Sequence, residues 1–213
     1  MLRRVAAVLG LLVLAGLLAW WGIWLCRPEL VVYLDPQLDG LVDPEAFASR
    51  FREAGVAHLR LRPYAGDVTL DSRGRTVCIA VVARPGRNPL LTPADLQAGL
   101  TGPGYTEDRL AGLYPEDLER FLVKHRRRFI QAGLQQDWGQ VRRYLYTNTA
   151  VHEAWHAAAQ SHSHNPRRVD SVMYWDAAGN VLQLGSRSLG FTDGHRERLR
   201  RMFRPRWPWE ACF

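Results

Sequence analysis

Three residues near the middle of the second half of the chain, His152, Glu153 and His156, have the types and spacing that metal-assisted hydrolysis needs. They form the pattern H-E-x-x-H. On a helix, positions i and i+4 lie about 40° apart around the axis, so both imidazoles can reach one metal ion. Glu153 then lies beside the metal, where a general base for metal-activated water is required. The flanking residues are mostly Ala, Val and Trp, which favours a buried helix as the support for this pair.

The segment after this helix extends the pattern. His162 gives H-E-x-x-H-x-x-x-x-x-H, and Ser171-Val172-Met173-Tyr174 follows. Over residues 149–175 the chain resembles the metzincin clan of zinc endopeptidases, whose signature H-E-x-x-H-x-x-G-x-x-H precedes a Met-containing turn. Within that clan it is most similar to matrixin-type sequences. The resemblance implies that His152, His156 and His162 are the three Zn²⁺ ligands. It also implies that Glu153 is the general base and that Met173 is the residue of the Met-turn.

One position departs from the metzincin signature, because Ala159 stands where the clan has Gly. A helix that continued to His162 would turn this ring away from the metal, so the helix must end before it. Such breaks usually need a left-handed residue, which costs a non-Gly residue about 1–2 kcal/mol. Three alternatives follow: Ala159 adopts that conformation, the break moves to residues 160–161, or His164 replaces His162 as the third ligand.

The function that the resemblance implies is hydrolysis of internal peptide bonds in a protein or peptide substrate. Zn²⁺ on three imidazoles keeps a fourth position for water, and Glu153 takes the water's proton and delivers it to the leaving amine. The alternative is a catalytically inactive zinc-binding interaction module tethered to a membrane. The remaining histidines, His58, His125 and His195, are not expected to be ligands.

The N-terminal segment predicts a membrane anchor. Residues 5–25 carry no charge and, at about 1.5 Å per residue, are long enough for a hydrocarbon layer of about 30 Å. Arg3 and Arg4 precede this run, so the positive-inside rule places the rest of the chain outside the cytoplasm. The sequence thus predicts a single-pass membrane protein with an anchor at 1–27 and an extracytoplasmic peptidase domain at 28–213. A cleaved signal peptide is the competing interpretation.

The charge and the cysteines of the chain bear on its binding partners and on its disulfide bonds. The chain has 28 basic and 21 acidic side chains, and its net charge of +7 is carried almost entirely by Arg. No compact pattern of Arg and aromatic residues indicates a nucleic-acid partner. With the domain outside the cytoplasm, Cys78 and Cys212 could form a disulfide. The alternative is a buried thiol at Cys78, with Cys26 and Cys212 as two unrelated thiols.

The elements that position the site are predicted from periodicity and breakers. The predicted class is α+β, a zincin-like domain with a mixed sheet, an active-site helix and a C-terminal helix, preceded by one transmembrane helix. The pattern predicts strands at 30–34 and 56–61, a hairpin over 68–82 and a short strand at 181–184. It predicts helices at 43–53 and 92–100, a long helix that begins at 115, and further helices at 138–146, around the H-E-x-x-H and at 195–203.

Overall fold

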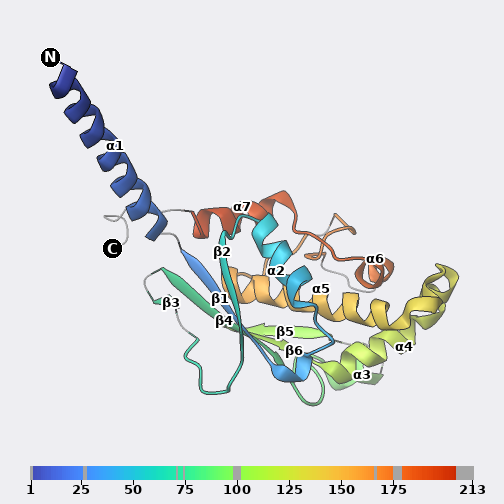
Figure 1. Cartoon of the computed structure of the whole chain (residues 1–213). Helices are drawn as coiled ribbons and strands as arrows, with labels where there is room; N and C mark the ends of the chain where they lie inside the picture. Colours follow the sequence, from blue (N-terminus) through green and yellow to red (C-terminus); the bar gives the residue numbers. More distant parts are fainter. Residues whose placement is uncertain are drawn as a thin grey trace.

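The computed structural model describes residues 2–25, 28–70, 72–73, 75–97, 102–165, 167–174 and 179–204. Within these residues six strands form one sheet in the order β2-β1-β4-β6-β5, with β3 paired to β4 (Figure 1). Their bounds are β1 Glu29–Leu34, β2 His58–Pro63, β3 Ser72–Arg73, β4 Thr76–Ala83, β5 Gly104–Glu107 and β6 Leu110–Leu113.

Most of this sheet is parallel. β1 pairs in parallel with β2 and β4, and β4 pairs in parallel with β6. Parallel strands tend to be apolar along their whole length, and β1 and β4 show this with ELVVYL and TVCIAVVA. Two pairings are antiparallel: the short strand β3 with β4, and β5 with β6, where β5 lies at the end of the strand order.

The long helix α5 runs across the sheet in Figure 1. α5 contacts β4, β5 and β6 as well as α2, α6 and α7. It is therefore buried nearly all round, which explains its lack of a polar face. The helices are α1 Leu2–Leu25, η1 Pro36–Leu38, α2 Pro44–Glu53, α3 Pro93–Gln97, α4 Pro115–Gln131, η2 Leu134–Asp137, α5 Trp138–Ala159, α6 Val181–Ser186 and α7 Asp193–Met202.

Local signals in the sequence placed α2 correctly. Asp43 is the N-cap and accepts hydrogen bonds from the backbone N–H groups of Glu45 and Ala46, with Pro44 in the first turn. Phe47 and Phe51, one turn apart, are fully buried against the sheet side of the core. Here the cap, the proline and the apolar spacing all agree, so the helix is specified without help from the rest of the chain.

Three elements differ from the prediction. Residues 138–146 and the H-E-x-x-H helix form the single helix α5. Residues 181–186 form the helix α6, where the sequence predicted a short strand at 181–184. The β5–β6 hairpin was not predicted, because two strands of four residues rich in Gly carry little periodicity and their turn needs the left-handed residue Asp108 (φ 47°).

The fold class and the membrane anchor need correction. The sheet with its interleaved helices is a mixed α/β arrangement, so the α+β class is wrong. Among the helices in the described part of the chain, none combines the length and the apolar character that crossing a membrane requires. The predicted transmembrane helix, and the single-pass location with an extracytoplasmic domain that rested on it, are therefore wrong. Cys212 lies outside the described residues, so the proposed pairing with Cys78 stays a prediction.

Candidate metal centre

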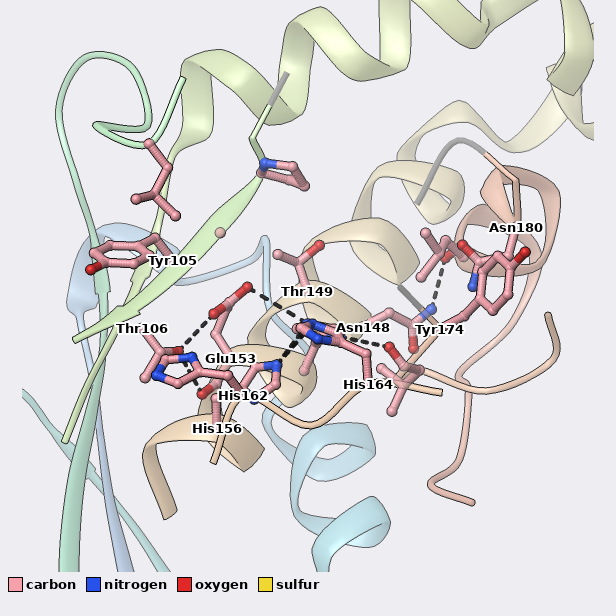
Figure 2. A pocket seen from close by; sticks show the side chains of 16 residues that line it. Tyr105, Thr106, Asn148, Thr149, Glu153, His156, His162, His164, Tyr174 and Asn180 are labelled. Carbon is pink, nitrogen blue, oxygen red and sulfur yellow. Dashed lines mark hydrogen bonds and ion pairs between the residues drawn. The ribbon is translucent and has the colours of Figure 1, made fainter. Parts of the chain in front are cut away.

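Three imidazole nitrogens meet at one point of the structure. The Nε2 atom of His156 lies 3.0 Å from that of His152 and 3.2 Å from that of His164, and the His164 and His152 Nε2 atoms are 3.2 Å apart. His152 and His156 project from α5, and His164 reaches them from the loop that follows (Figure 2). Among the described residues these three histidines form a group that could hold a metal ion.

Hydrogen bonds on the far side of the rings show what kind of group fits. The Nδ1 atom of His152 lies 2.8 Å from the Val172 carbonyl, and that of His156 lies 2.5 Å from the Ser161 carbonyl. A carbonyl only accepts, so both Nδ1 atoms must carry the proton and both Nε2 atoms present lone pairs. His164 is likewise hydrogen-bonded to the His162 backbone. Lone pairs facing each other repel, and a cation at their centre removes this repulsion.

The size of the triangle also fits a metal. Three nitrogens 3.0–3.2 Å apart place a tetrahedral ion about 1.9 Å from each, close to the zinc–nitrogen distance of about 2.0–2.1 Å. The donor set alone does not identify the metal, since imidazoles suit Zn²⁺, Cu²⁺, Fe²⁺ and Ni²⁺.

His162 is not a member of this group. Its ring is exposed and stacks on the His156 ring, with centroids 5.9 Å apart and an angle of 27° between the planes. The alternative third ligand, His164, is the residue whose Nε2 reaches the other two. Residues 160–163 carry the chain round the end of α5, so the third imidazole reaches the other two from the loop and not from the helix.

The helix breaks at Gln160, one residue beyond the position where the metzincin signature has Gly. Gln160 is left-handed (φ 47°, ψ 54°), which is costly for a residue with a side chain. Its side chain offsets part of this cost by donating to the carbonyls of Ala157 and Asp108. Arg109, from the β5–β6 turn, donates to the carbonyls of Ala157 and Ala158, and its positive charge suits the negative end of the helix dipole.

Glu153 is buried between α5 and β5 (8% exposed). Its Oε2 accepts a hydrogen bond of 2.6 Å from the Thr106 hydroxyl, and its Oε1 lies 4.0 Å from the His152 Nε2 atom (Figure 2). Gly104 makes this approach possible, because a Cβ there would be 2.5 Å from the Glu153 Oε1 and Cγ atoms. One oxygen is therefore held by the strand, while the other is left beside the histidine group.

Burial sets the protonation of these side chains. It raises the pKa of Glu153 to about 7, although the hydrogen bond from Thr106 opposes this change. It lowers the pKa of His152 to about 3 and that of His156 to about 4, with further lowering by neighbouring histidines. The pKa of His164 is also lowered, mainly by burial. The imidazoles are thus neutral and able to bind a metal, and Glu153 titrates in the range where a general base works.

The segment Ser171–Tyr174 holds the candidate metal site through backbone hydrogen bonds. The Val172 carbonyl holds the His152 ring, and the Met173 carbonyl accepts from the Asn165 N–H at 2.8 Å, just after His164. Met173 itself is fully buried in the core. The segment therefore fixes one ligand directly and the chain next to another through its backbone, as a Met-turn would, while the Met side chain fills the core.

A cavity of about 300 Å³ opens beside the three histidines. Its inner polar side chains are already engaged within the protein: the Asn148 amide donates to the Leu184 and Arg187 carbonyls, and the Thr149 hydroxyl donates to the Leu145 carbonyl. Glu153, His152, His156 and His164 are the cavity residues that lie at the candidate metal position. It is lined by Leu90, Pro103, Gly104, Tyr105, Thr106, Asn148, Thr149, His152, Glu153, His156, His162, His164, Val172, Tyr174, Asn180 and Leu184.

Thr106 and Gly104 are residues of the candidate site, next to Glu153, that sequence reasoning missed. Both lie on β5, where the sequence predicted no strand, and neither belongs to a motif. The signal that could have found them is the turn Glu107-Asp108-Arg109 between two short apolar stretches, which marks a hairpin. Even so, only the packing of β5 on α5 brings them to Glu153.

Comparison with protein-family models, with curated proteins and with solved structures found no match.

Proposed function

We propose that this chain is a zinc-dependent metallopeptidase. The observation that carries the proposal is the convergence of the His152, His156 and His164 Nε2 atoms at 3.0–3.2 Å, with the Glu153 carboxylate beside them. A group that only bound a structural metal would need no buried carboxylate aimed at it. Structural zinc sites have four protein ligands, whereas three imidazoles leave one position for a reacting molecule.

Each residue has a distinct role in the proposed reaction. Zinc, when bound, supplies a Lewis acid that polarises a carbonyl and acidifies water. His152, His156 and His164 hold it through Nε2, with the tautomers of the first two fixed by backbone carbonyls. Glu153 takes a proton at Oε1 and passes it to the leaving nitrogen, while its Oε2 stays bound to Thr106.

The β5 edge supports a peptide as the substrate class. β5 pairs with β6 on one side and, within the described residues, has no strand on the other. Pro103, Gly104, Tyr105 and Thr106 of this segment line the cavity. An extended peptide can add to such an edge by backbone hydrogen bonds, which would lay its carbonyl groups past the metal centre.

The test is a peptidase assay on the full chain with its metal removed and restored. Cleavage of an unfolded protein or a quenched-peptide library is measured with chelator, after return of Zn²⁺, and in the variant Glu153→Gln. We expect chelation to abolish cleavage and zinc to restore it. Glu153→Gln should keep its zinc and lose about 10²–10⁴-fold in turnover, which is the usual contribution of a general base.

Two single substitutions separate the candidate third ligands. His164→Ala should lower both zinc affinity and turnover, whereas His162→Ala should leave zinc affinity close to that of the unaltered chain. Retention of zinc without any cleavage would favour a binding module instead. Full turnover in Glu153→Gln would rule out the assigned base.

A further inference from the structure

The bend that delivers His164 is held from outside α5. Gln160 is left-handed without being Gly, and the loop 161–164 has little regular structure of its own. Two side chains of α7, His195 and Arg198, reach the carbonyls on either side of this bend. They are three residues apart, so they lie on one face of the helix.

His195 contacts the residue just before the third histidine. Its Nε2 lies 3.2 Å from the Ser163 carbonyl, so Nε2 carries the proton and donates. Its Nδ1 then accepts from the Thr192 hydroxyl at 2.5 Å. The ring packs edge-on against the fully buried Trp155, with centroids 4.6 Å apart, and His195 is only 7% exposed. Its orientation is therefore fixed on three sides.

The Thr192 hydroxyl shows that this arrangement has a cost. Thr192 occupies the N-cap position of α7, where a Thr side chain normally caps the helix. It makes no such cap and is hydrogen-bonded to His195 instead. A side-chain cap stabilises the start of a helix, so the chain gives up local helix stability to hold this imidazole.

Arg198 acts on the other side of the bend. Its guanidinium donates to the Ala159 carbonyl at 3.1 Å, at the end of α5. A cation there satisfies one of the last carbonyls and suits the helix dipole. Because Arg198 is exposed, its contribution is smaller than that of the buried His195.

We propose that His195, supported by Thr192 and Arg198, is the positioning residue for the third metal ligand, so that α7 completes the metal centre by locking the 160–164 bend. The inference rests on the proposed zinc site, and it adds that this site depends on a helix that contributes no ligand. Without these contacts from α7, metal binding itself must order His164, and the affinity for Zn²⁺ is therefore lower.

The experiment measures Zn²⁺ affinity of the metal-free full chain by competition with a chromophoric chelator. His195→Ala should weaken zinc binding by about 10–100-fold, the range found when an outer hydrogen-bond partner of a ligand is removed. His195→Gln, whose amide can still donate to Ser163, should recover most of it. Arg198→Ala should cost about 2–5-fold. The matched control is Arg201→Ala, since Arg201 is an exposed residue of α7 paired with Glu197, and it should cause no change.

A double-mutant cycle separates positioning from general damage. If His195 acts through His164, His195→Ala should cause no further loss in a His164→Ala background, whereas a merely structural role would weaken both backgrounds equally. Thermal unfolding of the metal-free variants checks that each folds. Should His195→Ala not fold, Thr192→Val, which removes only the hydroxyl partner, carries the same comparison.

Two results would overturn the inference. Wild-type affinity in His195→Ala and Thr192→Val, or an undiminished effect in the His164→Ala background, would show that α7 does not act on the third ligand. These results differ from failure of the proposed function, in which the unaltered chain would bind zinc but cleave no peptide. If the unaltered chain bound no zinc at all, the zinc site and this inference would both be wrong.

Discussion

Replacing Glu153 by Gln should stabilise the metal-free protein at neutral to alkaline pH and have almost no effect in acid. The Glu153 side chain is 10% exposed, and burial raises its pKa from 4.5 to about 7. Gln has nearly the same shape, keeps an oxygen for the Thr106 hydroxyl and does not ionise. The substitution therefore removes the cost of a buried charge while preserving its hydrogen bond.

The sign and size follow from proton linkage. Because the folded state holds the Glu153 proton more tightly than the unfolded state, this proton stabilises the fold fully below pH 4.5, and the contribution is lost as pH rises through 7. A shift from 4.5 to about 7, at 1.36 kcal/mol per pH unit, corresponds to about 3 kcal/mol. The advantage of Gln should therefore grow from near zero at pH 4.5 to about 3 kcal/mol at pH 8.

The assay is urea unfolding of the metal-free full chain at several pH values. Subtracting the unaltered chain from Glu153→Gln cancels the titration of the histidines, which both proteins share. Glu107→Gln, which removes an exposed carboxylate from the same strand, measures the effect of losing one negative charge from this basic chain. Bound zinc should shrink the difference, because its charge favours the carboxylate. A difference between the two proteins that does not change with pH would refute the burial argument.

Three further predictions concern the same site. Thr106→Val should lower turnover about 10–100-fold at unchanged zinc content, and Thr106→Ser should restore it. Equal turnover in the Val and Ser variants would mean that the Thr106 hydroxyl does not orient Glu153. Gly104→Ala should reduce turnover and stability together, measured by peptide cleavage and urea unfolding, since its Cβ would meet the Glu153 carboxylate at 2.5 Å. Zinc affinity, measured from pH 8 down to pH 6, should change by less than about tenfold. The pKa values of His152 and His156 are lowered to about 3 and about 4, so protons do not compete with the metal for these rings in that range. A steep loss of affinity below the ordinary histidine pKa of 6.5 would contradict this.

Local sequence was sufficient to predict the relative positions of side chains that lie on a single helix. The pair His152 and His156 and the neighbouring Glu153 follow from a period of 3.6 residues, and the structure places all three on α5 as the motif requires. The start of α2 was equally secure, because the Asp43 cap and the apolar spacing are both local. By contrast, residues 181–184 read as a strand and form part of α6, since short apolar runs do not distinguish the two and packing against α5 chose the helix.

Such local rules did not specify the candidate third ligand or the hydrogen-bond partner of Glu153. From the sequence, His162 and His164 are both close enough to close the site, and only the bend at Gln160 turns His164 toward the other two rings. That bend depends on Arg109 from the sheet and on Arg198 from α7, far away along the chain. Long-range packing thus selected a ligand that spacing left open.

The sequence by itself determined that two imidazoles and a carboxylate would share one helical face, because a regular helix fixes the angle between residues a few positions apart. Tertiary structure decided which third histidine joins them, which strand grips the carboxylate and how deeply the group is buried. Those outcomes depend on where irregular backbone is held by distant side chains, and no periodic pattern encodes such contacts.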